Sequence, residues 1–204
     1  RRVAYHEAGH IVVTYLLHPT DDVFKASIVS RRDALGVVYH QPREELFTSS
    51  RDRILANIKA ALGGYVAEKL KCESTSDGVA ADFQNAMMQA HQMVWKLGMG
   101  SNGFVGDYEV LLGSSIFRGA SQGDRLSDHM KEQLNDETHL ILKQCLGDVD
   151  VLLKQEDVLL ERFAGELLKK EELEYDEIEA IFAEYGKQRR FPAIPSPSSP
   201  PPAS

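Results

Sequence analysis

Apolar residues recur at helical spacing over most of the chain and at strand spacing over one short part of it. The helical pattern predicts six helices, at about residues 3–17, 50–70, 77–97, 126–146, 151–168 and 175–185. The first ends at His18-Pro19, because a residue before proline is pushed away from the α region. Asp77 can cap the third helix, and Gly186 stops the last.

β-branched and aromatic residues cluster or alternate in two short segments, 24–30 and 35–41. A short polar turn, 31–34, separates them, so the pattern predicts a β-hairpin. The expected fold class is therefore mainly α: an array of about six helices with one small β-hairpin.

Two segments show no sustained helical or strand periodicity of their apolar residues. Residues 98–123 hold seven of the chain's fifteen glycines, which is typical of a long loop that either moves over a site or is a slack connector. Residues 187–204 form a Pro- and Ser-rich tail, which we expect to be disordered, although a Pro-rich docking ligand is the alternative. We therefore expect one domain over residues 1–186.

The charge, the cysteine content and the length of the apolar runs exclude several classes of protein. The formal net charge of -8 argues against a nucleic-acid partner, because binding phosphates requires clustered Lys and Arg. Cys72 and Cys145 are the only cysteines, which excludes a disulfide framework and a thiolate zinc site. No stretch reaches the roughly 18 apolar residues of a membrane span. The chain begins at Arg1 without an initiator Met, so we expect a fragment of a longer protein.

The strongest chemical signal is the segment His6-Glu7-Ala8-Gly9-His10. His6 and His10 leave the same face of a helix at positions i and i+4, so their two ring nitrogens can bind one Zn²⁺. Glu7 then lies beside the open position of the metal, where it can act as a general base toward a water molecule. The pattern is that of a zinc protease, although the same five letters also arise by chance.

A third ligand is needed, and the residues alone leave two candidates. The HExxHxxGxxH class is excluded, because Val13 and Leu16 stand where it requires Gly and His. His18 lies beside the proline that ends the helix and is a poor candidate. Glu68, near the end of the second predicted helix, and Asp82, early in the third, could both reach the site, and each could equally be a solvated surface acid.

Four ordered blocks of sequence carry a family resemblance. They read AYHEAGH, KASIVSRRDALGVVYHQP, LGGYVAEKL and TSDGVAADFQNAMMQAHQMVWKLGM. In order and spacing they resemble the peptidase domain of the FtsH family, the M41 membrane-bound AAA+ zinc proteases. The resemblance extends over about residues 1–186 and is weakest in the glycine-rich segment.

The resemblance implies a role for each matching residue. His6, His10 and Asp82 match the zinc ligands of the family, with one Zn²⁺ per subunit, and Glu7 matches its catalytic base. Glu68 matches a glutamate that orients a ligand by hydrogen bonding. One strand matches the edge strand along which substrate is added as a further β-strand, and its residues are Gly36, Val37, Val38, Tyr39 and His40.

Two blocks depart from the usual family pattern. The chain has TSDGVAAD where the family has TTGASND, and GGYVAEK where it has GGRxAEE. The surroundings of Asp82 and Glu68 can therefore differ from those in the family, although the four core residues are all present.

The resemblance implies a zinc-dependent endopeptidase domain of an ATP-dependent protease that acts on unfolded or membrane proteins. No GxxxxGK[ST] phosphate loop occurs, so ATP acts only through an ATPase domain that is absent from this fragment. A hexameric, membrane-anchored full-length protein is implied, with this domain in the cytoplasm or an equivalent organellar compartment. Two alternatives remain: a degenerate peptidase domain that holds subunits or presents substrates, and a metal-free helical module with His6 and His10 in its core.

Overall fold

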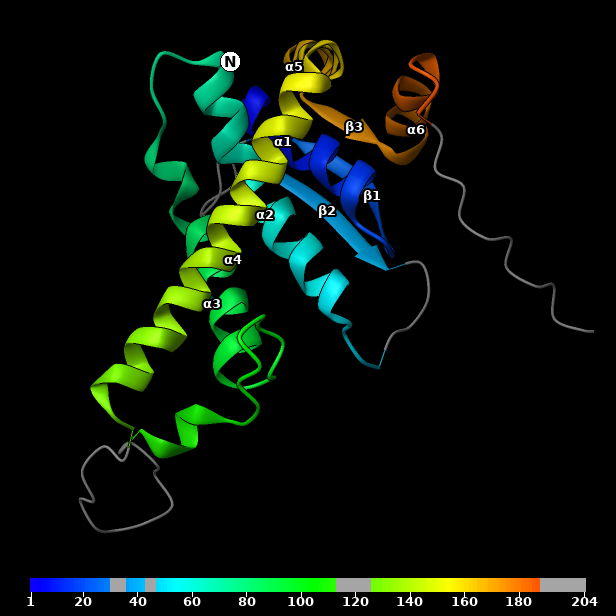
Figure 1. The fold of residues 1–204 in the computed structure, drawn as a ribbon. Coiled ribbons are helices and arrows are strands. Elements are labelled where there is room, and N and C mark those ends of the chain that lie inside the picture. Colours follow the sequence, from blue (N-terminus) through cyan, green and yellow to red (C-terminus); the bar gives the residue numbers. More distant parts are fainter. Residues whose placement is uncertain (30–35, 43–46, 113–125, 188–204) are drawn as a thin grey trace, which may run out of the picture.

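A computed structural model describes residues 1–29, 36–42, 47–112 and 126–187 of the 204-residue chain (Figure 1). Six helices and one small antiparallel sheet make up the described part, which confirms the predicted mainly α class. The helices are α1 (Arg2–Leu17), α2 (Arg51–Lys71), α3 (Ala80–Trp95), α4 (Asp128–Gln155), α5 (Asp157–Lys170) and α6 (Tyr175–Glu184).

Helix α1 is the central element of the core. Its side chains are buried on almost every side, and it packs against α2 and α5. Gly9 of α1 meets Gly63 of α2 at the crossing of the two helices: a β-carbon on Gly9 would lie 2.8 Å from the carbonyl carbon of Gly63. The two helix backbones therefore approach more closely than any side chain at this point would allow.

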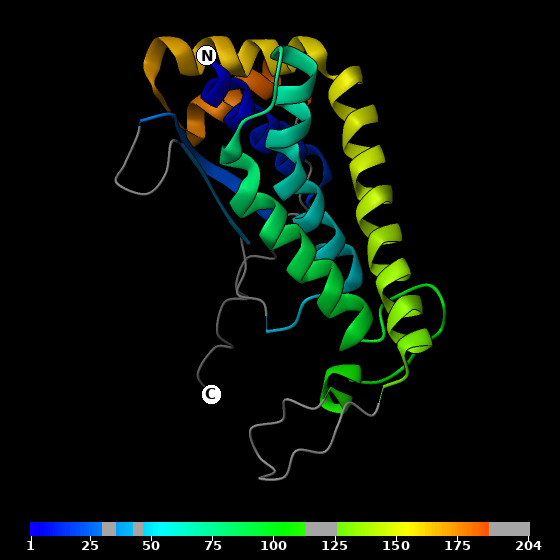
Figure 2. The same cartoon turned by 90° about the vertical axis from the view of Figure 1, so that its left-hand side faces the viewer.

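Helices α2, α3 and α4 run side by side and cover one flank of the molecule (Figure 2). Helix α4 is longer than the sequence pattern predicted. The predicted break at residues 147–150 is wrong, because Val149 and Leu153 continue the buried stripe of α4 and hold the chain helical as far as Gln155.

The sheet contains one strand that the sequence did not predict. The hairpin strands are β1 (Asp21–Ser27) and β2 (Val37–Pro42), and the predicted turn between them lies outside the described residues. The third strand, β3 (Glu172–Glu174), pairs with β1 and gives the order β2-β1-β3. A strand of three residues is too short to show an alternation of apolar and polar residues, so the sequence pattern cannot reveal β3. It forms a strand because it pairs with β1.

The segment before α3 also differs from the prediction. Asp77 does not cap α3 but opens a short 3₁₀ turn, η1 (Asp77–Val79), and α3 follows it without a side-chain cap. The described part of the glycine-rich segment contains a second 3₁₀ turn, η2 (Tyr108–Leu111). The rest of that segment and residues 188–204 of the predicted disordered tail lie outside the described residues.

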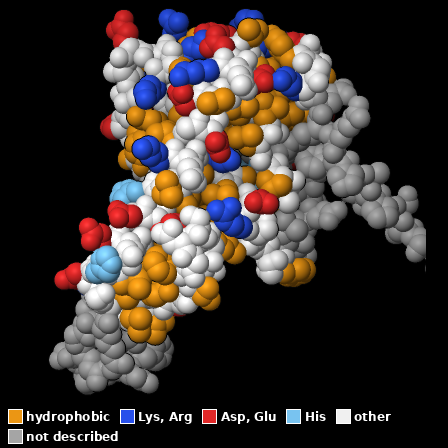
Figure 3. Space-filling model, viewed as in Figure 1, with side chains coloured by type: hydrophobic (Ala, Val, Ile, Leu, Met, Phe, Trp, Pro, Cys, Tyr) orange, Lys and Arg blue, Asp and Glu red, His pale blue; other side chains and the backbone are white. Residues whose placement is uncertain are grey.

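The surface carries intermixed charges. On the face drawn in Figure 3, Lys and Arg side chains alternate with Asp and Glu side chains rather than gathering in one patch. Within the described residues, no helix is both long and apolar enough to cross a lipid bilayer.

Candidate metal centre

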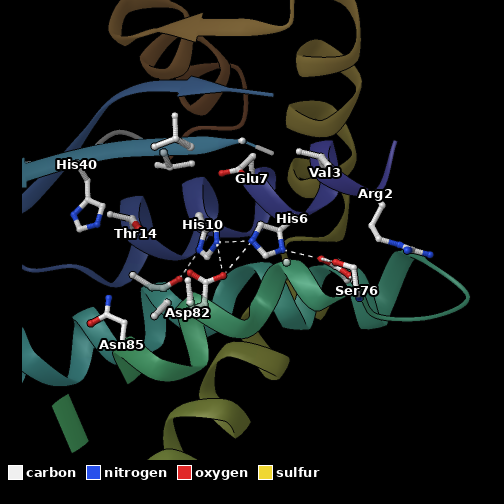
Figure 4. A pocket seen from close by; sticks show the side chains of 18 of the residues that line it. Arg2, Val3, His6, Glu7, His10, Thr14, His40, Ser76, Asp82 and Asn85 are labelled. Atoms are coloured by element: carbon white, nitrogen blue, oxygen red, sulfur yellow. Dashed lines mark hydrogen bonds and ion pairs between the residues drawn. The ribbon is translucent and has the colours of Figure 1, made fainter. Parts of the chain in front are cut away.

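A cleft of about 700 Å³ lies between α1, β2, the start of α3 and part of α2. Figure 4 shows the side chains that line it: His6, His10 and Glu7 come from α1, and Asp82 approaches from α3. The sequence motif and the two candidate carboxylates therefore border a single cavity.

Three ligand atoms converge in this cleft. The Nε2 atoms of His6 and His10 lie 3.0 Å apart, and Oδ2 of Asp82 lies 3.1 Å from the first and 3.4 Å from the second. The two histidines share a helix face because they are four residues apart. Asp82 joins them because it stands in the first turn of α3, which packs against α2.

The second nitrogen of each histidine is held by an acceptor. Nδ1 of His6 lies 2.8 Å from Oε1 of Glu68, and Nδ1 of His10 lies 2.8 Å from the carbonyl oxygen of Ala60. A carbonyl oxygen only accepts hydrogen bonds, so His10 donates from Nδ1, and the carboxylate of Glu68 favours the same tautomer in His6. In neutral imidazoles of this tautomer, both Nε2 atoms present lone pairs toward Asp82.

This donor set fits a zinc ion. Two lone pairs 3.0 Å apart, with a carboxylate oxygen beside them, repel one another unless a cation lies between them. Two ligand atoms of a tetrahedral zinc ion with bonds of about 2.0–2.1 Å lie about 3.3–3.4 Å apart. The three observed separations are within about 0.4 Å of that value. His6, His10 and Asp82 are also the one group of histidines and carboxylates with metal-binding spacing among the described residues.

Gly64 keeps the space in front of the histidines open. A β-carbon at this position would lie 2.6 Å from Nε2 of His6 and 2.7 Å from Nε2 of His10. The close crossing of α1 and α2 thus continues from Gly9 and Gly63 to the Nε2 atoms of His6 and His10.

Glu68 is not part of the group of three converging ligand atoms and contacts His6 at Nδ1 instead. It is 1% exposed, and besides His6 it accepts hydrogen bonds from the backbone N–H and the hydroxyl of Ser76, at 2.7 and 2.9 Å. Glu68 therefore connects His6 to the turn that leads into α3. The residues alone had left Glu68 and Asp82 as equal candidates, and the structure puts only Asp82 with the Nε2 atoms.

Sequence reasoning missed two groups that support the site, Ser76 and the carbonyl of Ala60. Ser76 stands directly before the predicted start of a helix, where a serine is typical of a cap. Its hydroxyl bonds to Glu68 instead. The carbonyl of Ala60 has no side-chain signal that a sequence could reveal.

The carboxyl group of Glu7 is buried at the edge of the cleft, with the residue 4% exposed. Burial raises its pKa above the ordinary value, the charges of His10 and His6 lower it in part, and Asp82 raises it further. A carboxyl group with a raised pKa beside a possible metal site is suited to accept and return a proton near neutral pH.

His10 and Asp82, which meet at Nε2 of His10, shift each other's pKa. Burial lowers the pKa of His10, but the hydrogen bond and charge of Asp82, the charge of Glu7 and the Ala60 carbonyl outweigh it and raise the pKa to about 9. Burial raises the pKa of Asp82, and the two histidines lower it more, to well below its usual range. Without a metal, His10 is therefore protonated near neutral pH, and its positive charge lies where a metal cation would be bound.

The strand predicted to bind substrate lies along the cleft. Gly36, Val37, Val38 and His40 line it, whereas Tyr39 is not among the lining residues and is 47% exposed. In the described part of the chain β2 pairs only with β1, so its outer edge carries unpaired backbone groups.

A helix that carries HExxH, with an acidic residue from another helix at the same point, is the donor arrangement of zinc metallopeptidases. The comparison with family models agrees, because residues 1–181 match peptidase family M41. The chain belongs to this family, which confirms the resemblance seen in the four sequence blocks.

Individual relatives support the same assignment. The chain is 34% identical over 182 residues to the "ATP-dependent zinc metalloprotease FtsH" of Borreliella burgdorferi, covering 87% of this chain and 28% of that protein. It is 35% identical over 181 residues to "ATP-dependent zinc metalloprotease FtsH 3" of Phytoplasma mali, covering 89% and 27%. The chain thus spans less than a third of the length of these relatives.

Proposed function

We propose that this chain is the zinc-dependent endopeptidase domain of an ATP-dependent FtsH-like protease that hydrolyses peptide bonds of unfolded or membrane proteins. The observation that carries the proposal is the convergence of Nε2 of His6, Nε2 of His10 and Oδ2 of Asp82 on one point. The relatives described above are named as zinc metalloproteases, which supports the same chemistry.

His6, His10 and Asp82 would hold one zinc ion. When bound, zinc supplies a Lewis acid that makes water a nucleophile near neutral pH and polarises the scissile carbonyl group. Glu68 and the Ala60 carbonyl keep the two Nδ1 atoms as donors, so that both Nε2 lone pairs stay directed at the ion.

Glu7 is the general base in this proposal. Its carboxylate takes a proton from the attacking water and returns it to the amine that leaves. The burial of Glu7, which raises its pKa, supports both steps, because a group whose pKa is closer to the working pH accepts and releases a proton readily.

Substrate would bind as an added strand along the free edge of β2. Backbone hydrogen bonds then provide the affinity, and the peptide must be extended and therefore unfolded. Five residues form this proposed substrate strand: Gly36, Val37, Val38, Tyr39 and His40. All of them except Tyr39 line the cleft, which supports the proposal. The side chain of Tyr39 points elsewhere, but its backbone can still pair with a peptide.

The remaining parts of the proposal rest on the family. ATP would act through an AAA+ ATPase domain in the same full-length chain, and six subunits would form a ring. The full-length protein would be anchored in a membrane, with this domain in the cytoplasm or an equivalent organellar compartment.

Metal content and cleavage of an unfolded protein such as casein test the catalytic proposal. We expect about one zinc per chain, and we expect Glu7→Gln to keep the zinc while cleavage falls at least about 100-fold. Glu73→Gln is the matched control, because Glu73 is exposed and outside the cleft. Cleavage that survives in Glu7→Gln would contradict the mechanism, and less than about half an equivalent of zinc would contradict the enzyme. Zinc without cleavage would support the non-catalytic alternative.

A further inference from the structure

A third histidine lines the cleft, outside the metal centre. His40 hangs from β2 into the end of the cleft beyond His10, on the side of Thr14 and Asn85 (Figure 4). Its Nδ1 atom lies 2.9 Å from Oδ2 of Asp21, whose side chain is 5% exposed. A buried carboxylate therefore fixes the orientation of an imidazole that faces the cavity and is 33% exposed.

Three residues, Thr20, Arg53 and His18, hold Asp21 in place. Its Oδ1 atom accepts hydrogen bonds from the hydroxyl of Thr20 at 3.0 Å and from the guanidinium group of Arg53 of α2 at 3.5 Å. Its backbone N–H donates to Nδ1 of the buried His18 at 2.8 Å, and Nε2 of His18 lies 2.9 Å from Oδ1 of Asn57. Burial raises the pKa of Asp21, but the hydrogen bond to His40 and the neighbouring groups lower it overall. Asp21 is thus a carboxylate that accepts from His40, and in the described part of the chain no hydrogen bond engages Nε2 of His40.

The strand geometry directs His40 into the cleft. The register of β1 shifts between Val23, which pairs with His40, and Lys25, which pairs with Tyr39. The extra residue, Phe24, belongs to β1, and bulges of this kind are common beside active sites. Gly36, Val37, Val38 and His40 line the cleft, and Val38 and His40, two positions apart, lie on the same face of β2.

This spacing relates His40 to the proposed general base. The main chain at Gly36 lies against the carboxylate of Glu7, because a β-carbon there would be 2.8 Å from Cδ of Glu7. At about 3.4 Å per residue, His40 is about 14 Å farther along β2. An extended peptide beside β2 would therefore bring a side chain about four residues from the cleaved bond to His40.

The chemistry at this end of the cleft favours an acidic side chain. The charge of Asp21 is already balanced by Arg53, and the neighbouring lining residues Asn57, Asn85 and Gln89 have side-chain amides that can donate hydrogen bonds. The described acidic residues of the lining belong to the metal end: Glu7, Glu68, Asp77 and Asp82. An incoming carboxylate at His40 thus meets donors and a charge-balanced pair.

We propose that His40, positioned by Asp21, forms a subsite that selects an Asp or Glu side chain of the substrate about four residues from the cleaved bond. This inference rests on the proposed peptidase function. Nε2 of His40 donates to the substrate carboxylate, while Nδ1 stays bonded to Asp21.

Peptide binding tests the subsite without requiring cleavage. A fluorescent, otherwise neutral peptide carries one Glu that is moved one position at a time, and its affinity for the zinc-loaded Glu7→Gln chain is measured by anisotropy. We expect one register in which Glu binds about tenfold more tightly than Gln at the same place, as for one charge-assisted hydrogen bond. The gain should vanish in Glu7→Gln/His40→Leu and in Glu7→Gln/His40→Gln. It should persist in Glu7→Gln/His139→Leu, since His139 is exposed on α4.

Each outcome decides the inference. Affinity that does not depend on the position of Glu, a profile that is the same with and without His40, or no binding at all would overturn it. Thermal unfolding of each variant verifies its folding, and the Gln variant keeps a polar side chain that can still bond to Asp21. Cleavage of the same peptides by the unaltered chain is scored separately: if none is cut while the Glu preference depends on His40, the proposed peptidase function fails and the subsite stands.

Discussion

The main chain at Gly36, directly before β2, lies against the side chain of Glu7: a β-carbon on Gly36 would be 2.8 Å from the carboxyl carbon of Glu7. The proposed general base and the proposed substrate strand are therefore in direct contact. A shift of one displaces the other, so that substrate position and base position are set together.

Replacing Gly36 by Ala tests this contact. The added methyl group meets the far end of a side chain that can turn away, so we expect little change in stability but a displaced carboxylate. Misplacement of a catalytic group by about 1 Å costs about 100-fold, so kcat/KM should fall by between about 10- and 100-fold with zinc content unchanged. Steady-state kinetics and metal analysis measure both quantities. Full activity in Gly36→Ala would show that the contact has no role in catalysis.

Glu68→Gln tests the support of His6. The neutral amide is a weaker acceptor for Nδ1 of His6 and for the two donors of Ser76, so we expect zinc affinity to fall about 10- to 100-fold. Competition with a chelator of known affinity measures the loss. The exposed Glu73→Gln is the control and should bind zinc as the unaltered chain does.

Gly9→Ala tests the crossing of α1 and α2. The new β-carbon would meet the backbone of Gly63, which cannot move without shifting α2, so we expect a loss of about 3 kcal/mol in the free energy of unfolding. That corresponds to a Tm about 6–12 °C lower. Gly147→Ala is the matched control with the opposite sign, because nothing lies within 4 Å of its β-carbon and the residue stands inside α4. It should stabilise the protein by about 0.5–1 kcal/mol, and equal Tm values for the two variants would contradict the close crossing.

The effect of zinc on stability should depend on pH through His10. Its pKa in the metal-free protein is raised from 6.5 to about 9, so its protonated form stabilises the fold fully below pH 6.5, and this contribution is lost as the pH rises to 9. Zinc needs the unprotonated Nε2 atom, so its affinity should increase about tenfold per pH unit over the same interval. Between pH 6.5 and 9 the metal-free Tm should therefore fall and the increase in Tm on adding zinc should grow. A zinc-induced shift that is independent of pH would contradict the raised pKa.

The sequence predicted the elements that depend on local geometry. Two histidines four residues apart share a face in any α-helix, so the placement of His6 and His10, with Glu7 between them, was predictable from five letters. The hairpin strands and the helix α2 followed from periodicity in the same way. Where packing overrides local signals, prediction failed: α4 continues through Gly147 because buried residues lie beyond it, and β3 is a strand only because β1 lies beside it.

The positions of the Glu68 and Asp82 carboxylates could not be predicted from sequence spacing and are defined only by the tertiary structure. By spacing alone Glu68 and Asp82 were equivalent, and only the family resemblance distinguished them. In the folded chain Glu68 meets Nδ1 of His6 and holds Ser76, and that contact orients the turn from which α3 brings Asp82 to Nε2. The helix and the shared position of His6, Glu7 and His10 could be predicted from the sequence, because they depend on neighbours within one turn. Which carboxylate meets which nitrogen follows from tertiary packing, because it depends on the close crossing of α1 and α2 at Gly9 and Gly63 and on the packing of α3 against α2.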